Sequence, residues 1–138
     1  MSIEAYARYW ETLSPATTGD LRGLARSDLV FRDPFNEIRG VDAVVAMLDR
    51  MFRDLGQPRF VVVRIASDGP VSFIRWDFTF ELRGRPLRIE GVSEVELDGE
   101  GRVARHIDHW DAAGQVYERI PLLGGLLRQV RKRLAAHD

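Results

Sequence analysis

Apolar residues in the first part of the chain recur every three or four positions, which is the spacing of one face of an α-helix. The pattern predicts a first helix over residues 3–13, ended by Ser14-Pro15, and a short second helix over about residues 20–26. A third helix is predicted from Asp42, its expected N-cap, to Gly56. The N-terminal part is therefore predicted to be mainly helical.

From residue 58 onward the apolar period changes to two, the period of a β-strand. Strands are predicted over residues 60–66, 71–82, 87–97 and 102–111, joined by turns rich in glycine. One face of the two middle strands is expected to point inward: Ser72, Ile74, Trp76, Phe78, Phe80, Leu82, Leu87, Ile89, Gly91, Ser93, Val95 and Leu97. Long antiparallel strands with one apolar face need a cover, and the preceding helices supply it. The pattern thus predicts an α+β domain whose curved, mostly antiparallel sheet wraps around the N-terminal helices.

Charge separates the end of the chain from the rest. Residues 119–138 carry five basic residues and one acid, whereas the first 118 carry 15 bases and 20 acids, a formal charge of −5. Apolar residues near the end recur at helical spacing. We therefore predict a pocket domain over residues 1–113 and a basic amphipathic helical extension over residues 114–138. The extension could pack on its own domain or on a twin subunit, contact an anionic membrane surface through residues 119–134, or bind another protein.

Composition excludes several classes of function. The chain has 138 residues, no cysteine and a formal net charge of −1, which favours one soluble domain and offers no global attraction to nucleic acid. Disulfides, zinc-cysteine sites and thiol chemistry are excluded, and the N-terminus lacks the pattern of a secretion signal, so we expect a cytoplasmic protein. No glycine-rich phosphate loop or nucleotide fingerprint occurs, and no cofactor is expected.

Asp33-Pro34 is the most informative motif in the chain. It directly follows a short predicted strand over residues 29–32, and the proline holds Asp33 in extended geometry. A carboxylate so placed beside Val30 and Phe31 could lie at the mouth of an apolar cavity and act as a general base. The alternative is a surface turn, for which Asp-Pro is a common sequence.

The order of these elements, with Asp33-Pro34 after the first strand and Gly-Arg-Val at residues 101–103, resembles the ketosteroid isomerase and SnoaL-like branch of the nuclear transport factor 2-like superfamily. The resemblance covers about residues 3–113. It implies a cone-shaped, cystatin-like fold in which a strongly curved sheet wraps a long helix and leaves a pocket open at one end. The superfamily includes isomerases, cyclases, dehydratases, epoxide hydrolases and non-enzymatic binders, so the resemblance specifies the fold better than the chemistry.

Three positions of the isomerases can be carried over to this chain. Their general base, the aspartate of an Asp-Pro pair, matches Asp33. Their oxyanion tyrosine lies in an Ala-Arg-Tyr run of the first helix and matches Tyr9, although Tyr6 competes for the inward direction. Their second oxyanion donor is an aspartate, and this chain has Ser93 there, which is a weaker donor.

The resemblance also places Trp110 of the last strand inside the pocket. Strand alternation then turns His106 and Asp108 inward with it and His109 outward. Such a pair could move a proton, or it could be structural and satisfy polar groups where the sheet closes. Each face of this strand offers two metal-ligating side chains, fewer than the three protein ligands of a catalytic zinc, so no metal is expected.

Together these residues favour an isomerase- or cyclase-type enzyme that moves a proton on an apolar, steroid- or polyketide-like carbonyl compound. Asp33 would be the base; Tyr9, His106 and Asp108 would assist it, and Trp76, Phe78, Ser93 and Trp110 would contact the substrate. The alternative is a non-catalytic binding domain for an apolar ligand, whose C-terminal helix contacts a membrane surface or a protein. A homodimer through the outer sheet face is compatible with both, and its expected contact residues are Arg75, Asp77, Arg88, Glu90, Glu94 and Glu96.

Overall fold

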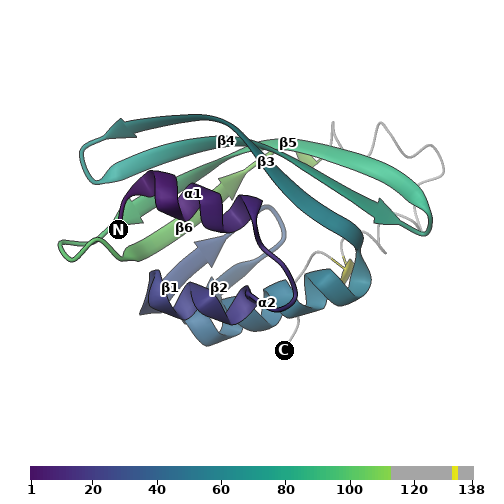
Figure 1. The fold of residues 1–138 in the computed structure, drawn as a ribbon, viewed down its shortest axis with the longest axis horizontal. Coiled ribbons are helices and arrows are strands. Elements are labelled where there is room, and N and C mark those ends of the chain that lie inside the picture. Colours follow the sequence, from purple (N-terminus) through teal and green to yellow (C-terminus); the bar gives the residue numbers. More distant parts are fainter. Residues whose placement is uncertain (113–131, 134–138) are drawn as a thin grey trace.

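The computed structural model describes residues 1–112 and 132–133, so the predicted extension lies outside the described residues apart from Lys132 and Arg133. The elements follow the predicted order of helices before long strands (Figure 1). They are α1 (Ile3–Glu11), the 3-10 helix η1 (Thr18–Gly23), β1 (Ala25–Arg32), β2 (Glu37–Arg39), α2 (Val41–Asp54), β3 (Gly56–Asp68), β4 (Val71–Leu82), β5 (Arg85–Leu97) and β6 (Val103–His109).

The six strands form one curved, unclosed sheet in the order β2-β1-β6-β5-β4-β3. All neighbours are antiparallel except β1 and β6, which pair in parallel with Phe31 opposite His106 and Arg32 opposite Ile107. Both α-helices lie on the concave side of the sheet (Figure 1). The predicted α+β architecture, with a mostly antiparallel curved sheet around N-terminal helices, is confirmed.

The core lies between α1, α2 and the concave face of the sheet. On α1, Ile3, Tyr6, Ala7 and Trp10 are buried, which is the expected result of apolar residues at helical spacing. The predicted inward face of the longest strands is also confirmed, because its side chains in β4 are all buried: Ser72, Ile74, Trp76, Phe78, Phe80 and Leu82. Two aromatic residues of this face, Trp76 and Phe78, line the cavity described below.

The prediction was wrong in several places between α1 and α2. The second helix is a 3-10 turn that ends at Gly23, and Arg26, which was expected in it, already belongs to β1. The short strand β2 was not predicted. Gly40, not Asp42, is the N-cap of α2, because the chain leaves β2 with a φ of 95° there, which glycine adopts without strain. Asp42 instead accepts a hydrogen bond from Arg22 at 2.7 Å.

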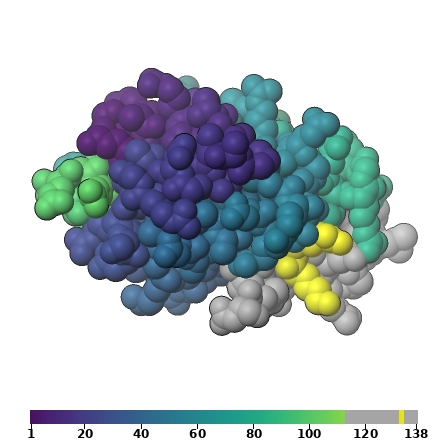
Figure 2. Space-filling view, turned by 60° about the horizontal axis from the view of Figure 1, so that its bottom comes forward, coloured from purple at the N-terminus to yellow at the C-terminus, as the bar shows by residue number. Residues whose placement is uncertain are grey.

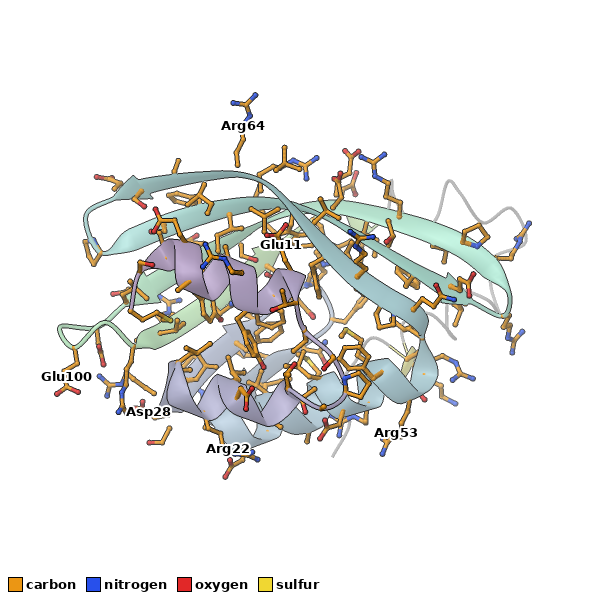
Figure 3. All side chains as sticks on the ribbon, in the orientation of Figure 1. Glu11, Arg22, Asp28, Arg53, Arg64 and Glu100 are labelled. Carbon is orange, nitrogen blue, oxygen red and sulfur yellow. The ribbon has the colours of Figure 1, made fainter. Side chains whose placement is uncertain are left out.

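The outer face of the sheet is polar at its centre. Arg75 lies 3.1 Å from Asp77 and 3.5 Å from Glu90, and Arg88 lies 2.9 Å from Asp77 and 3.1 Å from Glu90. Arg64 points away from the sheet on this side (Figure 3). Large apolar side chains are exposed on β3 and β4: Val61, Val63 and Phe73. The homodimer through this face stays a prediction.

Neither α-helix in the described part of the chain is long and apolar enough to cross a membrane. Contact of residues 119–134 with a membrane surface likewise stays a prediction, because nearly all of those residues lie outside the described ranges.

A glycine on β5 makes room for a tryptophan on β4. A Cβ atom at Gly91 would lie 2.4 Å from Cη2 of Trp76 and 3.0 Å from the His109 carbonyl oxygen. We therefore expect Gly91→Ala to lower the free energy of unfolding by about 1–3 kcal/mol, measured by urea denaturation, because the indole must shift within a packed core. Gly99→Ala is the control, since nothing lies within 4 Å of a Cβ atom there. Equal stability of the two variants would contradict the expected overpacking.

Candidate active site

Asp33 lies in the turn that follows β1. Its Oδ1 atom accepts hydrogen bonds from the backbone N–H groups of Phe35 (2.8 Å) and Asn36 (2.7 Å). The side-chain amide of Asn36 donates to both carboxylate oxygens, at 2.9 and 3.0 Å. Asp33 thus forms the turn that Asp-Pro sequences favour, and the same carboxylate also lines the largely apolar cavity described below. Asp33 is therefore both a turn residue and a carboxylate in the wall of a cavity.

Burial raises the pKa of Asp33 to about 6. The hydrogen bonds from Asn36 and from the backbone of Phe35 oppose this shift, because they stabilise the charged form, whereas the carboxylate of Asp108 adds to it by repulsion. Asp33 is therefore a carboxyl group that changes charge close to neutral pH.

Asp108 is held by a buried chain of hydrogen bonds that begins on α1. The Tyr6 hydroxyl lies 2.7 Å from Nδ1 of His106, and Nε2 of His106 lies 2.8 Å from Oδ1 of Asp108. Tyr6 and His106 are only 0% and 3% exposed. The imidazole is packed among aromatic rings, stacked on Phe31 at 5.1 Å between centroids and tilted against Trp10 at 5.1 Å. The prediction that His106 and Asp108 point inward is confirmed.

A second arm reaches the same oxygen from the neighbouring strands. Nε1 of Trp76 donates to the Ser93 hydroxyl at 2.8 Å, and Ser93 donates to Oδ1 of Asp108 at 2.5 Å. The β4–β5–β6 pairing sets this geometry, because it places Ser93 opposite Asp108 and aligns Trp76 with Gly91. Both arms end at Oδ1, and no described residue donates a hydrogen bond to Oδ2 of Asp108.

The indole of Trp76 fixes the direction of the hydrogen bonds in the second arm. An indole N–H can only donate, so Ser93 must accept from Trp76 and give its own hydrogen to Asp108. On the other arm, Nε1 of Trp10 has no partner within hydrogen-bond distance, yet it lies near enough to lower the pKa of the Tyr6 hydroxyl, which burial raises. Between Tyr6, His106 and Asp108 the tautomer of the imidazole sets which atoms donate.

The two carboxylates meet at a cavity of ≈ 70 Å³ between α2 and the concave face of the sheet. Its walls are mostly aromatic and aliphatic, with polar groups at a few points. They comprise Trp10, Phe31, Asp33, Met47, Leu48, Arg50, Met51, Phe60, Trp76, Phe78, Ile89, Asp108, Trp110 and Arg133. Asp33 and Asp108 also border an open hollow on the surface beside Pro34 and Trp110. Both acids can therefore be approached from more than one side.

Most of the residues that the sequence singled out lie in or beside this cavity. Trp76, Phe78 and Trp110 line it, whereas Ser93 borders a smaller adjoining space of ≈ 10 Å³. Tyr9 lies elsewhere, since its hydroxyl donates to the carbonyl oxygens of Thr17 and Thr18 at 3.0 and 2.9 Å. Burial and the nearby Asp20 raise the pKa of Tyr9 to about 12. Tyr6 is the tyrosine that joins the His106–Asp108 pair.

Sequence reasoning missed Asn36, the hydrogen-bond partner of Asp33, and several residues that line the cavity. Asn36 could have been found, because an amide three residues after Asp33 is a common partner in such turns. Met47, Met51 and Arg50 lie on α2, whose apolar stripe was predicted, but the pattern does not distinguish core from cavity wall. Trp10 likewise falls on the stripe of α1 and was expected in the core.

The described residues contain no group of three or more acidic or histidine side chains that could hold a metal ion. Of the four potential ligands predicted on the last strand, Asp111 lies beyond the end of β6. His109 lies on the outer face, where Nε2 is 3.2 Å from Oε1 of Glu94.

Comparison with known proteins identifies the fold and the sequence family that it resembles. Residues 3–106 match the model of the SnoaL-like domain. Among solved structures, an LEH-like epoxide hydrolase from M. tuberculosis shares 21% identity, covers 93% of this chain and 88% of its own, and has a TM-score of 0.69. A candidate SnoaL-like polyketide cyclase from Jannaschia sp. CCS1 has 14% identity, coverage of 88% and 92%, and a TM-score of 0.73.

A candidate isomerase of the SnoaL-like family from Agrobacterium tumefaciens has 18% identity, covers 79% of this chain and 93% of its own, and has a TM-score of 0.65. At these identities the likeness establishes a shared fold. A search of curated proteins found no significant match. The chemistry must therefore be argued from the site.

Removal of the Tyr6 hydroxyl should cost more stability than removal of the Tyr9 hydroxyl. Tyr6→Phe leaves the buried Nδ1 of His106 without its hydrogen-bond partner, and we expect a loss of about 1–3 kcal/mol in the free energy of unfolding. Tyr9→Phe removes bonds to backbone carbonyls in a partly buried place and should cost about 0.5–1.5 kcal/mol. Urea denaturation of both variants measures the difference. The reverse order would show that the network is not satisfied as described.

Asp33 should make the protein less stable as the pH rises from about 4 to about 7. Its pKa is about 6 in the folded state and 3.8 in the reference state, so between these values the folded chain binds a proton that the unfolded chain has released. Stability from this group is complete below the lower value and is lost as the pH passes the higher one. Relative to Asp33→Asn, the native protein should lose about 3 kcal/mol over this window, measured by urea denaturation at a series of pH values. A constant difference between the two proteins would mean that the pKa is not raised.

Proposed function

The chain belongs to the SnoaL-like domain family, and on this premise we propose that it is an enzyme that moves a proton on a compact, mostly apolar carbonyl compound, with Asp33 as the general base. One observation carries the proposal. Two carboxylates, Asp33 in the turn after β1 and Asp108 on β6, line one largely apolar cavity, and Asp108 adds to the raised pKa of Asp33. Paired acids in an apolar site are a common arrangement for taking up a proton and returning it.

The state of Asp33 suits the role of a base. With a pKa of about 6 it is mostly ionised at neutral pH, yet it is basic enough to hold a proton during the reaction. The backbone and Asn36 direct three of their four hydrogen bonds to Oδ1, so Oδ2 carries one and keeps lone pairs available. In the proposed step Asp33 takes the hydrogen bonded to the carbon next to the carbonyl group. The electrons of that C–H bond form the enolate, and the proton then returns to another carbon of the same molecule.

Asp108 is the second acid of the proposed reaction. Its Oδ1 accepts hydrogen bonds from His106 and Ser93, which fix the orientation of the carboxylate. In the proposed reaction Asp108 donates a proton to the oxygen of the substrate while Asp33 acts as the base. The hydroxyls of Tyr6 and Tyr9 are both engaged elsewhere, which supports this role for Asp108.

The size of the cavity favours a compact substrate. A volume of ≈ 70 Å³ is well below the roughly 300–1,000 Å³ of sites for drug-sized ligands, so a four-ring body does not fit the site in this conformation. Met47 and Met51 in the wall are flexible side chains that could make room for a somewhat larger molecule.

The alternative is a binding domain without catalysis. The observation in its favour is that the hydroxyls of Tyr6 and Ser93 are consumed inside the network, which leaves neither free to stabilise an enolate. In that reading the buried network is a structural part of the core, and the cavity simply holds an apolar ligand.

Turnover of a β,γ-unsaturated cyclohexenone tests the proposed reaction, because its conversion to the conjugated isomer is followed by ultraviolet absorbance. We expect Asp33→Asn to lower kcat/KM by about 10²–10⁴-fold, the usual contribution of a general base. In the native protein kcat/KM should rise as the pH passes 6, since Asp33 must be ionised. The larger β,γ-unsaturated ketosteroid should be turned over more slowly.

Asp28→Asn is the matched control, because Asp28 is an exposed aspartate that pairs with Arg26 and points away from the domain (Figure 3). It should leave kcat/KM unchanged. Binding of the ketone, seen as quenching of tryptophan fluorescence, with no turnover in the native protein would reject the enzyme and favour the binding domain. Equal turnover by Asp33→Asn would reject Asp33 as the base.

A further inference from the structure

One end of the cavity is basic, and the proposed proton transfer makes no use of it. Arg50 lies on the face of α2 that also carries Met47 and Met51, three residues before it and one after it, and all three line the cavity. Its side chain is neither fully buried nor fully exposed. No acidic side chain pairs with Arg50 among the described residues. A guanidinium in the wall of an apolar cavity without a counter-ion is costly unless something else pairs with it.

Arg133 adds a second guanidinium at the same end. Residues 132–133 lie beside the end of α2 (Figures 1 and 2), and Nη1 of Arg133 is 3.5 Å from the carboxylate of Asp54. Arg133 also lines the cavity, and its Nε atom is buried without a hydrogen-bond partner. The ion pair with Asp54 therefore uses one edge of the guanidinium and leaves the Nε–H unsatisfied.

The wall of the same cavity also has acidic and apolar parts. Asp33 and Asp108 supply its carboxylates, and Phe60, Phe78 and Ile89 are among its apolar residues. The cavity thus presents two guanidinium groups, an apolar surface and two carboxylates.

From this arrangement we infer that the ligand of the cavity is a monocarboxylate with a short apolar body, whose carboxylate binds Arg50 and Arg133. Arginine presents parallel N–H groups that match the two oxygens of a carboxylate, and a pair of this kind is strong because both partners are charged. The apolar body would lie against the aromatic wall and bring the reacting carbon toward Asp33. The inference rests on the proposed function only in that both use the same cavity.

Binding of phenylacetate and of phenylacetamide separates the charge from the shape of the ligand, since the two have nearly the same size. We expect phenylacetate to bind at least about tenfold more tightly, measured by isothermal titration calorimetry at neutral pH. Arg50→Met and Arg133→Met should each weaken phenylacetate binding by about tenfold or more and leave phenylacetamide binding within about twofold. Arg50→Lys, which keeps the charge but not the paired N–H groups, should fall between native and Arg50→Met.

Arg53→Met is the matched control, because Arg53 lies on the same helix, is exposed and points away from the domain (Figure 3). Arg53→Met removes one positive charge, as Arg50→Met and Arg133→Met do, and should leave the affinities for phenylacetate and phenylacetamide unchanged. The inference is overturned if the amide binds as tightly as the acid, if neither arginine variant changes the ratio of the two affinities, or if phenylacetate does not bind at all. None of these readouts depends on turnover, so loss of the proton-transfer proposal and loss of this inference remain distinguishable.

Discussion

The parallel pairing of β1 with β6 is the contact on which the site depends. It joins the first strand of the chain to the last and sets Phe31 opposite His106. Since Asp33 follows β1 directly and Asp108 lies two residues beyond His106, the same register brings two acids that are far apart in sequence to the same end of the sheet. The helices then cover the concave face, and the curvature of the long strands β3–β5 leaves a space that side chains do not fill. A slip of one residue in this pairing would turn His106 and Asp108 to the outer face.

How far the sequence predicted this arrangement depends on the range of the interactions involved. Alternation in the long strands is a local property, and it correctly gave the inward direction of Trp76, Ser93 and His106. The turn at Gly40 and the strand β2 were missed, because they depend on pairing with β1 and not on any pattern within residues 37–40. The carry-over from the resemblance chose Tyr9, whereas the buried network contains Tyr6. Tyr6 and Tyr9 lie three positions apart on the same helix, so sequence spacing alone does not show which of them joins the network.

The polar network could not have been predicted from spacing either. Its members come from α1, β4, β5 and β6, and its order depends on which side-chain atoms approach one another. The same holds for the cavity, since a stripe such as that of α2 looks alike whether it faces a filled core or an open space. The two arginines at the basic end show the limit most clearly. Arg50 was indistinguishable in sequence from the solvated charges around it, and its position in the wall follows only from how α2 lies on the sheet.

The donor-only indole of Trp76 limits the traffic of hydrogen ions on one side of Asp108. An indole nitrogen has no lone pair with which to accept, so the arm through Ser93 ends at Trp76 and offers no route along which a proton could leave Asp108. Ser93 and Trp76 are also almost wholly buried. Asp108 borders the open hollow on the surface, so a proton that leaves it departs on that side. Exchange of this proton with water therefore takes place at the surface and not through the interior of the sheet.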